Sequence, residues 1–254
     1  MKIGILANSS LNDFYLEALR PILSDNKLSV ELVIVDSRPQ KTLLQKVVKN
    51  LKRGRGGYLA VMGLQKLFRD TSKSESTELF FNESEIPVLK TEEPYSENIT
   101  TKIGSYNLDA LLLIGGFGII KEPLLSLTPY GILSYHHGNM RRYRGMPPVF
   151  WELYNGEKKM GLTVQKLSAN LDAGSPLVEK NVKIYPNDSL KALKARAYKK
   201  SEDMLYKAIT VIADEKFKLR PISEIGDVYT LPNFRQWVLL NLKVTFRKIR
   251  YIFK

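Results

Sequence analysis

The sequence contains no cysteine and only two histidines among its 254 residues. Without cysteine it cannot form a disulfide framework, a thiolate zinc site or a cysteine nucleophile, and it suits a reducing compartment. No apolar run reaches the roughly 20 residues of a membrane-spanning helix. The apolar start, Met1 to Ala7, is too short for a secretory signal. We therefore expect a cytoplasmic protein, at most peripheral to the inner face of the membrane.

Acidic residues are also scarce relative to basic ones. The chain has 39 Lys and Arg against 26 Asp and Glu, which gives a formal net charge of +13. Hydrophobic residues make up 44% and charged residues 26%, a globular composition. The charge indicates either a merely soluble basic surface or a polyanionic partner, such as RNA, an anionic membrane surface or a phosphorylated substrate.

The opening of the chain alternates strand-like and helix-like segments. Residues 2–6 and 30–35 are short apolar runs typical of buried strands. Between them, apolar residues from Phe14 to Ile22 recur with helical spacing, and residues 42–51 have helical character as well. This order predicts an α/β fold with a mainly parallel sheet.

The rest of the chain continues the pattern and then becomes helical. Gly115, Gly116 and Gly118 directly follow the clearest strand, and a boundary near Pro186 divides an α/β unit (1–185) from a helical C-terminal region (186–254). We expect a loop over 70–83 because that segment is polar. The remaining expectations are strands at 86–89, 109–114, 132–135, 161–167 and 177–184, and helices at 58–68 and 189–213.

Two short segments carry the chemistry that the sequence offers. His136 and His137 follow a predicted strand and begin a loop rich in Gly and Arg. Such loops line the binding crevice of open α/β sheets, and histidine suits proton transfer near neutral pH. Asp172 lies further on, in NLDAG. Taken alone, the histidines also fit a structural pair, and the aspartate fits an ordinary turn.

Taken in order, these segments resemble the folate-dependent formyltransferases, a family that includes glycinamide ribonucleotide, methionyl-tRNA and amino-sugar N-formyltransferases. The resemblance rests on LSYHHGNMRRYRGMPP and NLDAGSPLV, and it is strong over residues 109–184. It implies a Rossmann-like formyltransferase domain with a helical C-terminal appendage. It also implies 10-formyltetrahydrofolate as the formyl donor.

The resemblance assigns roles to individual positions. The family's catalytic histidine falls on His136 and its aspartate on Asp172, so a protonated His136 would stabilise the oxyanion while Asp172 holds it. The family's catalytic asparagine falls on Ser134, whose hydroxyl can donate a hydrogen bond but is shorter than an amide. No metal is implied. The segments that correspond to the family's folate pocket contain Phe117, Gly118, Ile119 and Ile120 on one wall and Asn170, Leu171 and Asp172 on the other.

The acceptor is less constrained. Arg141, Arg142 and Arg144 follow the histidines and suit a phosphorylated or nucleotide-linked amine, although they also fit a solvated loop. KRGRGG at 52–57 lacks the spacing of known phosphate loops. We expect an amino sugar rather than tRNA, because the tRNA enzymes of the family carry a C-terminal barrel. The alternatives are a folate deformylase and a protein that only binds its ligand.

The last segment, 231–254, contains six Lys or Arg and no acidic residue. Its composition is that of a basic amphipathic helix, which can lie on an anionic membrane. A helix that docks its apolar face on the core or on a second subunit has the same pattern. The stripe comprises Phe234, Val238, Leu242, Ile249 and Phe253, with Trp237 and Tyr251 nearby.

Overall fold

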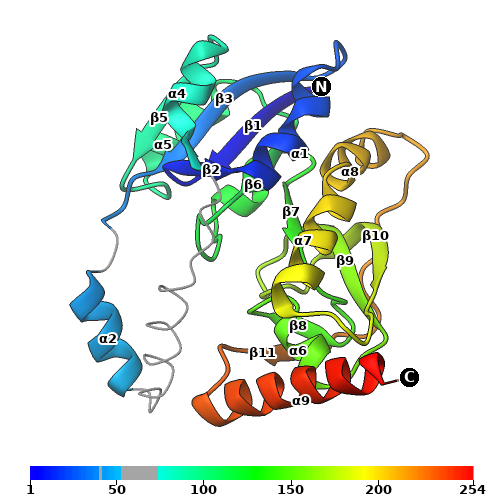
Figure 1. Cartoon of the computed structure of the whole chain (residues 1–254). Helices are drawn as coiled ribbons and strands as arrows, with labels where there is room; N and C mark the ends of the chain where they lie inside the picture. The colour runs from blue at the N-terminus through cyan, green and yellow to red at the C-terminus, as the bar shows by residue number, and fades with distance from the viewer. Residues whose placement is uncertain (40–41, 53–73, 254) are drawn as a thin grey trace.

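The computed structural model describes residues 1–39, 42–52 and 74–253. A seven-stranded sheet forms its centre, in the order β10-β9-β7-β6-β1-β3-β5 (Figure 1). Five neighbouring strands are parallel, whereas β9 runs antiparallel to both β7 and β10. The α/β fold with a mainly parallel sheet is therefore confirmed. The strands are β1 (Lys2–Ala7), β3 (Ser29–Asp36), β5 (Val88–Thr91), β6 (Ala110–Ile114), β7 (Ile132–His136), β9 (Lys159–Lys166) and β10 (Ser175–Lys183).

Both faces of the sheet are buried. Side chains alternate along each strand, so Ile5 of β1 belongs to one apolar cluster and Leu6 to the other. The first cluster is covered by α1 (Asp13–Leu23), α7 (Leu190–Ser201) and α8 (Met204–Ile212), and the second by α5 (Glu97–Gly104). Burial on both faces explains why the strands appear in the sequence as continuous apolar runs.

The predicted loop at 70–83 is wrong over its described part. Residues 74–76 form β4 (Ser74–Ser76), which pairs with β2 (Ser10–Asn12), and α4 (Thr77–Glu83) follows directly. The hydroxyl of Ser76 caps this helix by accepting from the Leu79 amide at 3.5 Å. Phe81 is its one fully buried apolar side chain and anchors it to the core. A helix with a single apolar anchor has too weak an apolar period to stand out in a polar stretch.

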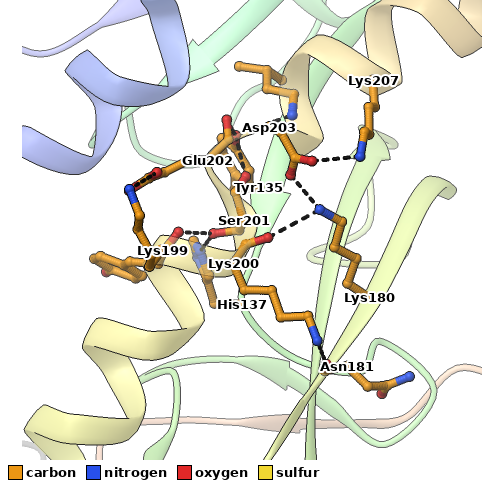
Figure 2. Close-up of polar contacts among 12 residues, drawn as sticks. Tyr135, His137, Lys180, Asn181, Lys199, Lys200, Ser201, Glu202, Asp203 and Lys207 are labelled. Carbon is orange, nitrogen blue, oxygen red and sulfur yellow. Dashed lines mark hydrogen bonds and ion pairs between the residues drawn. The ribbon is translucent and has the colours of Figure 1, made fainter.

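The predicted helix over 189–213 consists of two helices, α7 and α8. The hydroxyl of Tyr135 lies at their junction, where it donates to the Ser201 carbonyl at 3.0 Å and accepts from the Leu205 amide at 3.2 Å (Figure 2). Lys180 pairs with Asp203 at the same place. These contacts from β7 and β10 replace the helical hydrogen bonds that the break removes.

The C-terminal part is helical, as predicted. After α8 the chain forms β11 (Asp227–Tyr229), which pairs with β8 (Tyr143–Gly145), and ends in α9 (Phe234–Ile252). α9 lies against the short helix α6 (Phe150–Tyr154). The division at residue 185 stays a prediction.

Two sequence predictions concern residues that the structure does not describe. The helix over 58–68 lies wholly outside the described residues, and so does KRGRGG except for Lys52, the last residue of α2 (Leu43–Lys52). Over the ranges that are described, no helix combines the length and the apolarity needed to cross a bilayer.

Candidate active site

The polar side chains at the end of β7 lie on opposite faces of the sheet. Ser134 and His136 point to one face, and Tyr135 and His137 to the other, because successive strand residues alternate. The His137 ring stacks on the Tyr135 ring at 5.6 Å between centroids, and its Nε2 lies 3.0 Å from the Ser201 hydroxyl (Figure 2). Burial lowers the pKa of His137 to about 3. His137 is therefore a neutral packing residue.

His136 is held at both ring nitrogens. Nε2 lies 2.7 Å from the Tyr143 carbonyl oxygen, and Nδ1 lies 3.4 Å from Oδ2 of Asp172. A carbonyl only accepts, so Nε2 carries a proton. Burial opposes the charged ring, but the hydrogen bond and charge of Asp172, together with the carbonyl, outweigh it and raise the pKa of His136. The site thus shifts the His136 ring toward its imidazolium form.

Asp172 is held as a carboxylate by three donors. The Gly145 amide donates to Oδ2 at 2.8 Å, and the Gln165 side chain lies 3.4 Å from Oδ1. Burial opposes its charge, but the contacts with His136, Gly145 and Gln165 prevail and lower the pKa of Asp172. Its backbone has φ +44°, in the left-handed region, where aspartate is tolerated. The left-handed conformation of this one residue therefore directs its carboxylate toward His136.

Gln165 is a site residue that the sequence analysis missed. It lies on β9 directly opposite Ser134 and is fully buried. Its Oε1 accepts from the Gly174 amide at 3.0 Å while its amide faces Asp172. An amide side chain that follows the mostly apolar run MGLTV is a weak signal that could have pointed to it.

Gly138 makes room for the histidine ring. A Cβ atom at this position would lie 2.5 Å from Nε2 of His136 and 3.0 Å from the Tyr143 carbonyl oxygen. Both distances are too short for any side chain without movement of the ring or the backbone. The glycine after the two histidines therefore permits the hydrogen bond that orients His136.

Ser134 lies on the same face as His136 and is buried, with 8% of its surface exposed. Its hydroxyl lies 3.4 Å from the neighbouring Tyr135 carbonyl, which is at the long limit of hydrogen bonding. Because this contact is weak, the hydroxyl can turn toward a better partner.

The loop after β6 exposes backbone and one side chain. Phe117 and Ile120 are buried in the core, with 1% and 6% exposed, whereas Ile119 is 64% exposed. Gly118 has φ +81°, a conformation that favours glycine. The predicted folate segment therefore offers a ligand its peptide groups and Ile119, but not the phenyl ring.

Two residues outside the predicted site support this loop. Arg38 donates to the Phe117 carbonyl at 2.7 Å and is itself held by Asp36 at 2.6 Å. The Tyr95 hydroxyl donates to the Ile119 carbonyl at 3.0 Å. Neither contact is visible in the sequence, because both join distant segments. The one local signal is an acid–base pair, Asp36 and Arg38, just after a strand.

On the other predicted wall, Asn170 is exposed and Leu171 is 42% exposed. The Leu171 carbonyl accepts from Arg144 Nε at 3.0 Å. Of this wall, the structure brings Asp172 to His136. That the loop at 117–120 and this one enclose a single pocket stays a prediction.

The three arginines after the histidines all have protein partners. Arg141 pairs with Glu179, and Arg142 pairs with Glu157 at 2.9 Å. Besides Leu171, Arg144 donates to the Gly226 carbonyl at 3.2 Å. These contacts tie the loop to β10, to the turn after α6 and to the segment before β11. A phosphate would therefore have to compete with existing partners.

Glu152 of α6 is a second buried carboxyl near the histidine. It is 2% exposed and lines the same small cavity as His136 and Tyr143. Burial raises the pKa of Glu152 to about 7. No sequence signal marked it, because a lone glutamate in FWELY looks like a solvent-facing helix residue. Among the described residues, no cluster of His, Asp and Glu could hold a metal ion.

Comparison with known sequences gives a consistent picture. A family model described as formyl transferase matches residues 25–209. Methionyl-tRNA formyltransferase of Geobacter metallireducens is 31% identical over 111 residues, which are 44% of this chain and 36% of that protein. The enzyme of the same name from Thermodesulfovibrio yellowstonii is 22% identical over 200 residues, 79% of this chain and 60% of that protein. The alignments thus span about a third to three fifths of these relatives.

Solved structures share the fold. Glycinamide ribonucleotide transformylase 1 of Symbiobacterium toebii has a TM-score of 0.57 at 19% identity, over 89% of this chain and 94% of its own. The N-formyltransferase of Helicobacter canadensis, in complex with folinic acid and dTDP-3-aminofucose, has a TM-score of 0.61 at 14% identity, over 96% of this chain and 80% of its own. Because the family model matches well over half of the chain and the fold agrees, the chain belongs to the formyl transferase family.

Proposed function

We propose that the protein transfers a formyl group from 10-formyltetrahydrofolate to the amine of an amino sugar carried on a nucleotide. The observation that carries this proposal is the arrangement of His136, held between the Tyr143 carbonyl and the carboxylate of Asp172 at the end of a parallel strand. When bound, the folate supplies a formyl group activated by its attachment to nitrogen.

The residues of the chain fit such a donor. Gly118 and its neighbours present peptide groups that can hydrogen-bond to a flat heterocycle, and the exposed Ile119 and Leu171 offer apolar contact. At the ends of the neighbouring strands β1 and β6, Oδ1 of Asn8 is buried, close to Gly115, and has no hydrogen-bond partner within the described structure. An unpaired buried acceptor is costly, so a ligand N–H at this place would be favoured.

The transfer forms a carbon–nitrogen bond to the acceptor and breaks the one to the folate nitrogen. The proton lost by the acceptor amine ends on that folate nitrogen. His136 has one proton committed to Tyr143 at 2.7 Å, while its Nδ1 lies 3.4 Å from Asp172, longer than a good hydrogen bond. We assign Nδ1–H to the developing oxyanion, which would share it with the weakly held Asp172 carboxylate while that carboxylate keeps the ring charged.

Ser134 is the proposed second donor to the oxyanion. It lies on the face of β7 that carries His136, and its hydroxyl has no strong competing contact among the described residues. An oxyanion donor contributes on the order of 3 kcal/mol to transition-state stabilisation. A hydroxyl in place of the family's amide must first be oriented, which predicts a smaller contribution.

For the acceptor, the support comes from the structural neighbours. The Helicobacter canadensis N-formyltransferase, with dTDP-3-aminofucose, and WlaRD, a sugar 3N-formyl transferase studied with dTDP and 5-N-formyl-THF, each align over 96% of this chain. Glycinamide ribonucleotide transformylase 1 aligns in structure over 89% of this chain. The slightly longer structural alignment, which takes in nearly the whole chain, is what favours an amino-sugar nucleotide.

The test is a direct assay of the full chain with 10-formyltetrahydrofolate and three acceptors: a dTDP-linked amino sugar, glycinamide ribonucleotide and methionyl-tRNA. We expect tetrahydrofolate to appear only with the sugar, together with a formylated product in the mass spectrum. His136→Ala should abolish both signals, and His137→Ala is the matched control that should keep them. Formylation of either other acceptor instead would refute the sugar assignment.

Two alternatives have distinct outcomes in the same assay. Release of formate without any acceptor would identify a deformylase on this scaffold. Failure to bind a stable folate analogue at high micromolar concentration would identify a protein that has lost catalysis, the alternative raised by Ser134 in place of the family's asparagine.

A further inference from the structure

The terminal helix α9 docks on the protein through one side only. Leu240 is 1% exposed, and Trp237 and Val244 pack against the same core cluster. On this docked side Lys243 donates to the Tyr154 carbonyl at 2.8 Å, and Arg247 to the Pro186 carbonyl at 3.2 Å. These contacts settle which face of the helix meets the body of the protein.

The apolar stripe predicted from the sequence is not this docked face. At about 100° per residue, Leu242 and Ile249 lie roughly opposite Leu240 on the helix. They are 50% and 46% exposed, and Phe246 beside them is 68% exposed. The full outer face, exposed by between 41% and 85% per side chain, comprises Phe234, Val238, Leu239, Leu242, Phe246, Ile249, Ile252 and Phe253.

Basic residues border this outer face. Arg250 lies along one edge and Lys248 toward the other, and Arg235 lies within it. The sequence holds no acidic residue from 231 to 254. An apolar centre with cationic borders is the pattern of helices that lie in the headgroup region of a membrane.

A second helix repeats the pattern independently. On α2, Leu44 is 74% exposed, Val48 42% and Leu51 54%. Lys52 is also exposed, and the sequence has no acidic residue between Asp36 and Asp70. α2 and α9 both lie at the lower edge of the molecule in Figure 1, away from β1, β3 and β5.

We propose that the outer face of α9, assisted by α2, binds the surface of an anionic lipid bilayer. Charge decides between this occupant and a second copy of the chain. If two copies met through α9, two basic helices without acidic residues would face each other. The two molecules, each with a net charge of +13, would repel one another. An anionic bilayer instead neutralises the basic borders while the apolar centre enters the headgroup boundary. The docked side of α9 does not face the bilayer, so the helix can contact the protein core and the membrane at the same time.

The test is co-sedimentation of the full chain with vesicles of phosphatidylcholine, with and without a quarter of phosphatidylglycerol, at low and high salt. We expect binding only to the anionic vesicles and its loss at high salt. Lys248→Gln with Arg250→Gln should weaken binding about 25-fold, at roughly fivefold per charge. Lys102→Gln, at an exposed position on α5, is the charge control and should bind as the wild type does.

The apolar part is tested by Phe246→Ser with Ile249→Ser, which we expect to weaken binding at least about tenfold. Leu79→Ser is the matched control, because Leu79 is a 61% exposed apolar residue on α4. Thermal unfolding of every variant checks that the docked side is intact. Equal binding to neutral vesicles, or no binding to either kind, would overturn the proposal. So would a concentration-dependent dimer that the same two serines abolish, because it would assign the face to a second copy.

Discussion

Glu152 offers a sharp test of the structure, because it is a carboxyl buried without a cationic side chain hydrogen-bonded to it among the described residues. In the folded protein burial raises the pKa of Glu152 from 4.5 to about 7, although the charge of His136 opposes the shift. Removal of this titration by Glu152→Gln should change how the free energy of unfolding depends on pH. The side chain keeps its shape, so packing is nearly unchanged.

The sign follows from proton binding. Between pH 4.5 and 7 the folded protein holds a proton on Glu152 that the unfolded chain has released, so stability falls as pH rises. One pH unit is worth about 1.36 kcal/mol per proton. Between pH 5 and pH 8 the wild type should therefore lose about 2 to 3 kcal/mol relative to Glu152→Gln.

The assay is urea unfolding of both proteins at the two pH values, followed by circular dichroism. Titrations that Glu152 does not influence cancel in the difference. Glu83→Gln, at an exposed position on α4, serves as the control and should show no such pH dependence relative to the wild type. If the stability gap between wild type and Glu152→Gln is the same at pH 5 and pH 8, the buried placement of this carboxyl is refuted.

Three further predictions concern the proposed site. His136→Ala should lower the formylation rate by at least about a hundredfold. His137→Ala should lower the unfolding temperature and leave the rate nearly unchanged. An inactive His137 variant together with an active His136 variant would reverse the assignment. Asp172→Asn removes the charge that raises the pKa of His136, so the alkaline limb of the pH–rate profile should move to lower pH, and an unmoved limb would separate the two residues. Ser134→Asn should raise the rate if residue 134 is a weak oxyanion donor; a lower rate would mean that the loop is built around serine, and an unchanged rate that this side chain does not touch the transition state.

The sequence by itself determined the elements that bury residues on both faces. The bounds predicted for β1, β3, β6 and β7 agree with the structure to within about one residue. A short continuous apolar run bounded by turn residues is typical of a buried strand. The same local reasoning predicted α1, whose cap at Asn12 accepts from the Tyr15 amide at 3.2 Å. Short-range hydrogen bonds and the period of apolar residues are visible in the sequence without knowledge of the fold.

The tertiary structure decided whatever depends on partners far along the chain. Arg38 meets the Phe117 carbonyl across 79 residues, and Gln165 faces Ser134 only because β9 runs antiparallel to β7. Glu152 is buried because α6 closes over the cavity beside His136.

The direction in which α9 faces has the same origin. Apolar residues nearly surround this helix, so their period does not indicate which side docks. The docked side is the one that carries Leu240, which contacts the core cluster. Those contacts exist only in the folded protein. A sequence shows that a side chain can be buried, but the neighbours that bury it, or leave it exposed, come from segments that folding brings together.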